Sequence, residues 1–142
     1  MKYLLDTHAA VWALEESPHL SPRVRDLILD RSPADFVIAD VTILEVACLI
    51  RSSRLPRKED PVARLEKLCA LFLPVRITTQ IAWRAASLDW AHRDPADRLI
   101  CATALEHDLI LVTRARKITE WGAVPVFIVF YVKKFSLCFA SH

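Results

Sequence analysis

HRDPADRLICATALEHDLILVTR, residues 92–114, is the stretch that decides the fold of this 142-residue chain. Asp94 is a good helix N-cap, and Pro95 follows at the first helical position, where the missing N–H removes no hydrogen bond. The apolar spacing over Leu99–Leu105 predicts that the helix continues. After a short turn, Leu109–Val112 is apolar throughout, as expected of a buried strand. The stretch therefore predicts a capped helix followed by a strand that packs into a sheet.

Other short apolar runs predict further strands, at Tyr3–Leu5, Phe36–Ala39, Val75–Ile77 and Val124–Val129. Capped or amphipathic segments predict helices between them, at Ala9–Leu14, Arg23–Leu29, Thr42–Ser52, Val62–Phe72, Thr78–Trp90 and, as a single turn, Ile118–Trp121. The predicted order is β-α-α-β-α-α-β-α-α-β-(α)-β, which is typical of a parallel α/β sandwich. We expect one domain over residues 1–129, followed by an atypical apolar tail over residues 130–142.

Composition excludes several classes of protein. A hydrophobic content of 54% in 142 residues is enough for one domain with a real core. The formal net charge of +2 does not by itself indicate nucleic-acid binding. Gly122 is the single glycine, so there is no glycine-rich loop to hold a nucleotide phosphate. The first residues, MKYLLDTH, lack an apolar signal region, and no run reaches transmembrane length, so we expect a cytoplasmic protein without a membrane partner.

Cysteine and histidine spacing predicts neither disulfides nor a zinc site. No two of the four cysteines form a C-x-x-C pair. Cys48, Cys69 and Cys101 lie in apolar, helix-like sequence, so we expect small buried thiols in a reducing compartment. The five histidines show no spacing typical of zinc ligands.

Three carboxylates fall at corresponding places of the predicted topology. Asp6 directly follows the strand Tyr3–Leu5, Glu45 lies in the first turn of the helix after the second strand, and Asp97 opens the helix before the strand Leu109–Val112. Helices run antiparallel to strands in such a fold, and functional groups gather at the carboxyl ends of parallel strands. We therefore expect the three side chains to converge at one edge of the sheet.

Each acid also has an ordinary structural interpretation. In this interpretation, Asp6, Asp94 and Asp97 cap helices and have no further role. Thr42-x-x-Glu45 fits a capping box, in which Glu45 accepts a hydrogen bond from the backbone N–H of Thr42. Clustered carboxylates repel one another, however, and a hard divalent cation, Mg²⁺ or Mn²⁺, is the simplest explanation of a cluster. Such a cation lowers the pKa of a bound water and neutralises charge on a phosphoryl oxygen.

Basic residues lie close to the same places in the sequence. Arg98 follows Asp97, and Arg114, Arg116 and Lys117 follow the strand Leu109–Val112. These side chains are candidates for holding a polyanionic backbone, and solvated surface charge is the alternative interpretation.

Four segments together resemble the PIN domain, and more narrowly the VapC-type toxin ribonucleases of bacterial toxin–antitoxin pairs. They are LLDTH at Leu4–His8, T-x-x-E at Thr42–Glu45, HRDPADRLICATA at His92–Ala104 and LVTR at Leu111–Arg114. The D-P-x-D-R segment with LVTR is the specific part, and the resemblance covers nearly all of residues 1–129.

The resemblance implies a three-layer α/β/α sandwich with a short parallel sheet of four to five strands. It also implies Mg²⁺- or Mn²⁺-dependent RNA cleavage, homodimers and inhibition by a cognate antitoxin. Asp6, Glu45 and Asp97 match the metal-binding acids of the family, and Asp94 matches an acid that often accompanies them. Thr7 and Thr113 match small hydroxyl positions at the rim of the site.

An antitoxin partner also suggests an apolar groove for an amphipathic helix. Candidates to line it are Trp12, Leu49, Ile50 and the helix that carries Trp83 and Trp90, and core packing is the alternative role for each.

One departure from the family pattern concerns the acid that commonly follows T-R. Here Thr113-Arg114 is followed by Ala115, so a carboxylate that helps complete the metal site is missing. Loss of a second-shell group typically lowers metal affinity or activity about 10–100-fold. Asp94 is placed to compensate in part.

Three functions therefore remain open from the sequence. The first is an active endoribonuclease in which Asp6, Glu45 and Asp97 hold the metal, and Asp97 or Asp94 orients the attacking water. The second is a degenerate PIN domain that binds RNA or antitoxin with weak or no catalysis, which Ala115 favours. The third is another metal-dependent phosphohydrolase, which ranks last because the first strand is followed by Asp6-Thr7-His8 and not by a D-x-D motif.

Overall fold

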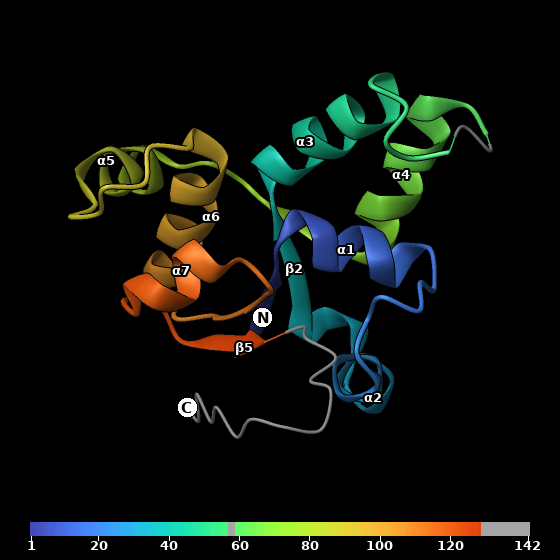
Figure 1. Ribbon diagram of the computed structural model, residues 1–142, viewed down its shortest axis with the longest axis horizontal. Coiled ribbons are helices and arrows are strands. Elements are labelled where there is room, and N and C mark those ends of the chain that lie inside the picture. Colours follow the sequence, from blue (N-terminus) through green and yellow to red (C-terminus); the bar gives the residue numbers. More distant parts are fainter. Residues whose placement is uncertain (57–58, 129–142) are drawn as a thin grey trace.

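Five strands form one parallel sheet in the computed structural model of this protein, which describes residues 1–56 and 59–128 (Figure 1). The strands are β1 Tyr3–Leu5, β2 Phe36–Ala39, β3 Leu73–Val75, β4 Ile110–Thr113 and β5 Val126–Ile128. Their order across the sheet is β3-β2-β1-β4-β5, and each neighbouring pair is parallel. The N-terminal strand β1 is therefore the central strand, as its uniformly buried side chains require.

Helices occupy the connections between these strands in the predicted order. They are α1 Thr7–Leu14, α2 Pro22–Asp30, α3 Asp40–Arg51, α4 Pro61–Leu71, α5 Thr79–Ser87, α6 Pro95–Glu106 and α7 Arg116–Trp121. The side-chain cap predicted at Asp94 is present, and Ser21, Asp60 and Thr78 cap α2, α4 and α5 in the same way. The predicted tail, residues 130–142, lies outside the described residues.

Several predicted boundaries are wrong. Helix α1 begins at Thr7 and not at Ala9, and β5 begins at Val126 and not at Val124. The third strand is Leu73–Val75 and not Val75–Ile77, because its register against Val37–Ala39 is set by pairing with β2. Helix α3 begins at Asp40, two residues before Thr42, which lies fully buried inside the helix. Helix α5 ends at Ser87 and does not reach Trp90.

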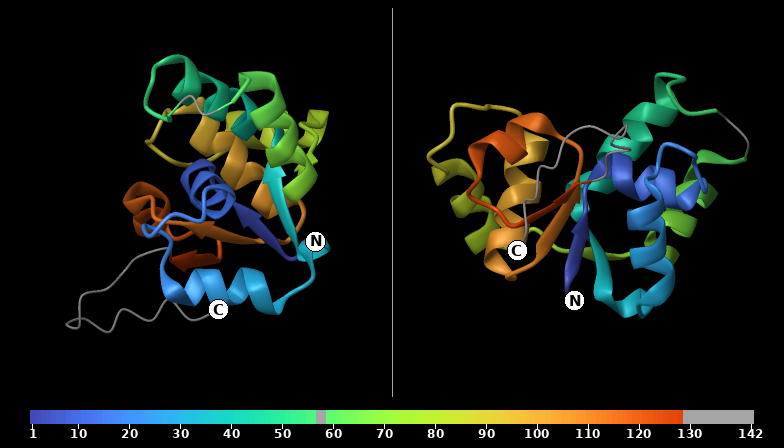
Figure 2. Two further views of the ribbon diagram at one scale, coloured as in Figure 1. Left: turned by 90° about the vertical axis from the view of Figure 1, so that its right-hand side faces the viewer. Right: turned by 60° about the horizontal axis from the view of Figure 1, so that its bottom comes forward.

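The sheet lies between two helical layers, which confirms the α/β/α sandwich. One layer contains α1, α2, α3 and α4, and the other contains α5, α6 and α7 (Figure 1). Figure 2 shows the same separation, with the strands between the two groups of helices. Alternation along β1 explains it, because Tyr3 and Leu5 pack into the first core cluster and Leu4 into the second.

Helix α5 ends early because Arg98 holds the following residues as a loop. Its guanidinium donates hydrogen bonds to five backbone carbonyl oxygens, those of Ala85, Ala86, Leu88, Trp90 and His92. Arg98 is itself in the first helical turns of α6, so this side chain fixes the path of the chain into the α6 N-terminus.

The predicted burial of the cysteines is confirmed only in part. Cys101 is fully buried, and burial together with the charge of Asp97 raises the pKa of its thiol to about 12. Cys69 is partly buried, but Cys48 is exposed, so the buried thiol predicted there is wrong. Cys48 lies on α3, but the face of this helix that packs into the core carries Thr42, Val46 and Ile50 instead. Over the described part of the chain, no helix is both long and apolar enough to cross a membrane.

A buried ion pair joins the end of α1 to α4. Arg64 is 4% exposed, pairs with Glu15 and donates a further hydrogen bond to the carbonyl oxygen of Pro56. A buried guanidinium that loses its carboxylate keeps the cost of desolvation without the compensating attraction.

We expect Glu15→Gln to lower the free energy of unfolding by about 2 kcal/mol, since Glu15 is only partly screened by solvent. Urea unfolding of the purified protein measures this change. The matched control is Glu120→Gln, which breaks the exposed i,i+4 pair with Arg116 and should change stability by less than about 0.5 kcal/mol. Equal effects of the two substitutions would contradict the prediction.

Candidate active site

Asp6 lies at the carboxyl end of the central strand and is 7% exposed. It is the N-cap of α1, and its Oδ1 accepts a hydrogen bond of 2.8 Å from the backbone N–H of Ala9. The Thr113 hydroxyl, at the end of the neighbouring strand β4, donates to Oδ2 at 2.5 Å. Asp6 is therefore both a cap, as one interpretation predicted, and a carboxylate oriented from two elements at the edge of the sheet.

Glu45 projects from α3 toward the same edge. Its Oε1 accepts a hydrogen bond from the Thr7 hydroxyl, which also lies 3.3 Å from the hydroxyl of Thr42. The capping-box alternative is wrong, because α3 starts at Asp40 and Glu45 lies beyond its first turn. The predicted position of Glu45 in the first turn is wrong for the same reason.

The α6 N-terminus supplies two further acids. Asp94 is the N-cap, and its Oδ1 accepts hydrogen bonds from the backbone N–H groups of Ala96, at 2.9 Å, and Asp97, at 3.1 Å. Asp97 lies in the first turn as predicted, and its Oδ2 is 2.6 Å from Nε2 of His92. The ligand atoms of His92, Asp94 and Asp97 all lie within 4.8 Å of one another.

The predicted acids lie near one another, because Thr7, the neighbour of Asp6, donates to Glu45, and one groove is lined by Thr7, Glu45 and Asp94. Burial raises the pKa of Glu45, and the charges of Asp97, Asp94 and Asp6 raise it further, against the lowering effect of the Thr7 hydrogen bond. Burial also raises the pKa of Asp6, with an opposing contribution from Thr113 and a small raising contribution from Asp97. Acids from β1, α3 and α6 therefore act on one another across one sheet edge.

The donor set fits a hard divalent cation. Within residues 1–56 and 59–128, no lysine or arginine forms a salt bridge with any of these four acids. Lysine and arginine ion pairs therefore do not relieve their mutual repulsion, although His92 contacts Asp97 and the charge of His8 lowers the pKa of Asp6. Carboxylate oxygens are the ligands that Mg²⁺ and Mn²⁺ take. Asp6, Glu45 and Asp97, with Asp94 beside them, are the residues able to hold such an ion.

The predicted basic residues lie in different settings. Arg114 stacks on Trp12, with 4.5 Å from the guanidinium carbon to the ring centroid. Arg116 and Lys117 are exposed on α7, where Arg116 pairs with Glu120. Arg98 is partly buried and bonds to backbone carbonyls instead, so its geometry supports a structural role and not RNA binding.

Ala115 occupies the N-cap of α7, with φ −66° and ψ 112° and no side-chain hydrogen bond to the helix. Its backbone N–H donates to the Thr113 hydroxyl at 3.0 Å, which links it to Asp6. The position of the missing family acid therefore lies beside the acid cluster.

An open groove of about 580 Å³ runs beside the acids between α3 and the start of α6. Polar lining comes from Thr7, Glu45 and Asp94, and apolar lining includes Val41 and Leu44. Leu44 is 64% exposed.

The apolar groove predicted from Trp12, Leu49, Ile50, Trp83 and Trp90 does not form as one surface. Ile50 is buried, and Trp12 and Trp83 lie in opposite helical layers. Only Leu49 lines the groove beside the acids. Helical periodicity identified apolar residues but not the layer into which each one packs.

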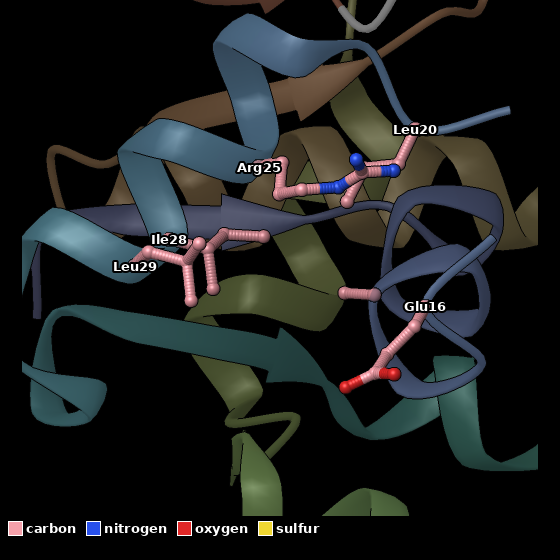
Figure 3. Close-up of a pocket in the computed structure, with 6 residues that line it drawn as sticks. Glu16, Leu20, Arg25, Ile28 and Leu29 are labelled. Atoms are coloured by element: carbon pink, nitrogen blue, oxygen red, sulfur yellow. The ribbon is translucent and has the colours of Figure 1, made fainter. Parts of the chain in front are cut away.

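A second hollow, of about 390 Å³, lies between the end of α1 and α2 and shares no residue with the groove. Figure 3 shows Leu20, Ile28 and Leu29 around it, with Glu16 and Arg25 as the charged side chains. Because Asp6 caps the opposite end of α1, this hollow is separate from the acid cluster.

His92 is the site residue that sequence reasoning missed. His92 shows no zinc-ligand spacing, and the signal that identifies it is H-x-D-P-x-D, with His92 five residues before Asp97. Thr42, whose hydroxyl lies beside that of Thr7, is a second site residue to which no role was assigned except that of a cap.

Comparisons with known proteins agree with this geometry. The sequence model of the PIN domain matches residues 3–121. Ribonuclease VapC22 of Mycobacterium tuberculosis is 34% identical over 116 residues, which cover 81% of this chain and 88% of the relative.

Solved structures share the fold. A chain of DNA-bound VapBC from Salmonella typhimurium matches with a TM-score of 0.70 and 17% identity, over 92% of this chain and 99% of its own length. A chain of FitAcB from Neisseria gonorrhoeae matches with a TM-score of 0.69 and 22% identity, over the same share of each. These likenesses show the fold. The family match and the VapC22 alignment show that the chain belongs to the PIN domain family and is a homologue of the VapC ribonucleases.

Proposed function

We propose that this chain is the endoribonuclease toxin of a toxin–antitoxin pair, and that it cleaves RNA phosphodiesters with Mg²⁺ or Mn²⁺. The observation that carries the proposal is the gathering of acids at one sheet edge, where Thr113 donates to Asp6, its neighbour Thr7 donates to Glu45, and the groove beside them is lined by Glu45 and Asp94. The similarity to ribonuclease VapC22 supports the reaction. A cytoplasmic location is part of the same proposal.

In this proposal, three acids bind the ion and two hydroxyls orient two of these acids. Asp6, Glu45 and Asp97 hold the ion, and hydroxyls orient two of them, with Thr113 donating to Asp6 and Thr7 to Glu45. The bound ion supplies charge neutralisation at the phosphoryl oxygens and a more acidic water.

Asp94 is available as a proton acceptor. Both of its cap hydrogen bonds go to Oδ1, which leaves Oδ2 to take a proton from a water. Orientation of the attacking water is therefore assigned to Asp94 in this proposal.

RNA would approach along the groove between α3 and α6. Arg114, Arg116 and Lys117 follow β4 directly, so they lie close to the edge that carries Asp6 and Thr113. Cations at this edge are suited to hold the phosphates on either side of the cleaved bond. Arg98 is not one of these RNA-binding residues, because its guanidinium donates to backbone carbonyl oxygens.

A cognate antitoxin and a second copy of the chain are the protein partners in this proposal. Solved neighbours include chains of VapBC complexes from Salmonella typhimurium and Rickettsia felis. Large apolar side chains on α3, α4 and β3 are exposed and available for such contacts: Leu44, Val62, Leu71 and Leu73.

A second candidate is a PIN domain that binds RNA or antitoxin without cutting. Ala115 favours it, because one acid of the family pattern is absent from the edge of the site.

We expect Asp6→Asn to lower RNA cleavage in Mg²⁺ or Mn²⁺ by at least about 100-fold, since it removes a charged ligand. Asparagine is as good an N-cap as aspartate, so α1 should remain intact. Gel analysis of a labelled single-stranded RNA measures cleavage, and Asp26→Asn on the exposed side of α2 is the control. Unchanged cleavage by Asp6→Asn would refute the proposed function, and no cleavage by the natural chain would favour the non-cutting candidate.

Ala115→Asp should restore a carboxylate and also cap α7. We expect tighter Mn²⁺ binding, by about 10-fold or more, and about 1 kcal/mol of added stability. Ala115→Asn is the matched control, because it caps the helix without adding charge. Calorimetric titration with Mn²⁺ and urea unfolding separate the two effects. Equal Mn²⁺ affinity of the two variants would show that position 115 does not reach the ion.

The effect of Mn²⁺ on stability should depend on pH. Because the pKa of Asp6 and of Glu45 is raised in the folded chain, the folded state holds these protons more tightly than the unfolded state. Ionisation therefore costs stability as the pH rises through the raised values, and Mn²⁺ offsets this cost only once the protons leave.

Thermal unfolding measures this dependence. Near 100 times its Kd, Mn²⁺ should raise Tm by about 5–10 °C at pH 7.5 and by clearly less at pH 5. The same shift at both values would contradict the proposed role of the two carboxyls, and Asp6→Asn should show a reduced shift at both.

A further inference from the structure

His92 lies against one of the acids and is part of a rigid assembly. Its Nε2 is 2.6 Å from Oδ2 of Asp97, and its side chain is 15% exposed. The residue belongs to the loop between α5 and α6, and not to either helix, so its position depends on how that loop is held.

The loop backbone is held by Arg98. Its Nη1 donates to the carbonyl oxygens of Trp90, at 2.9 Å, and His92, at 3.0 Å. These charge-assisted hydrogen bonds fix the loop backbone at Trp90 and at His92. The backbone of His92 is thus tied to the same helix that carries Asp97.

The imidazole ring packs at a tilt of 57° against Trp90, which is stacked on Trp121. The Trp90 ring lies 4.8 Å from the His92 ring and 4.5 Å from that of Trp121 on α7, nearly parallel to the latter at 12°. Trp121 donates from Nε1 to the carbonyl oxygen of Asp89 at 3.0 Å, which ties α7 to this loop. The His92 ring therefore has restricted freedom to turn away from Asp97.

We propose that His92 is a positioning residue that holds the Asp97 carboxylate in the orientation needed for divalent-metal binding. The inference rests on the proposed function. One oxygen of Asp97 is engaged by His92, which leaves the other for an ion shared with the neighbouring acids. A fixed carboxylate loses less side-chain entropy on binding an ion than a mobile one.

The missing acid at position 115 makes this orientation more important. With fewer carboxylates at the site, each remaining one contributes a larger part of the ion affinity. Trp121 follows Ala115 on the same short helix, so α7 acts on the site through the aromatic stack and His92 instead of through an acid.

The test compares Mn²⁺ binding by the natural chain, His92→Ala, His92→Gln and His107→Ala, using calorimetry at pH 7.5. We expect His92→Ala to weaken binding about 10–100-fold. His92→Gln places an amide N–H near the position of Nε2 and should recover most of the loss. His107, at the opposite end of α6, is the matched control and should leave Mn²⁺ binding unchanged. Circular dichroism and Tm check that each variant folds.

Each outcome decides the inference. Equal binding by His92→Ala and His107→Ala would overturn it, as would a failure of His92→Gln to recover affinity. Electron spin-echo spectra of bound Mn²⁺ that show a histidine nitrogen coupling lost in His92→Gln would also overturn it, because His92 would then be a direct ligand. Absence of Mn²⁺ binding by the natural chain would overturn the proposed metal site together with this inference. Normal binding and cleavage that are insensitive to His92 would overturn the inference alone.

Discussion

Burial of the Asp6 carboxylate at the carboxyl end of β1 is the constraint on which the site depends. A buried carboxylate is costly unless donors surround it, and here the donors come from α1 and from Thr113 on β4. The two carboxylate oxygens of Asp6, at the end of β1, thus accept hydrogen bonds from α1 and from β4. The remaining charge cost, seen as a raised pKa, is what a bound cation can relieve.

Helix caps and apolar runs in the sequence were sufficient to predict the architecture and the edge of the sheet at which the acids lie. Caps such as Asp94-Pro95 and fully apolar strands such as Tyr3–Leu5 specify their elements within a few residues, and both are confirmed. The parallel order then brings Asp6, Glu45 and Asp97 to one edge, because helices return antiparallel to strands. The predicted convergence needed only topology, and in the structure Thr7, next to Asp6, donates to Glu45 while Glu45 and Asp94 line one groove.

Long-range contacts explain what could not be predicted. Arg98 was assigned to a polyanion from its position after Asp97, yet its donors end the preceding helix and hold a loop. No periodic pattern records a side chain that bonds to backbone carbonyls. Cys48 shows the same limit, since an apolar helical sequence does not say which residues its partners leave exposed. The bonding partners of Arg98 and the exposure of Cys48 both depend on contacts between separate elements of the fold.

The central place of the first strand has a consequence for the order of events during synthesis. Thr113, which donates to Asp6, lies 107 residues further along the chain, and β1 is flanked by β4 as well as by β2. During synthesis, the chain therefore carries Asp6 without the strand that completes the sheet around it until β4 has been added. The donor that orients Oδ2 of Asp6 is thus supplied only by a chain that already includes β4.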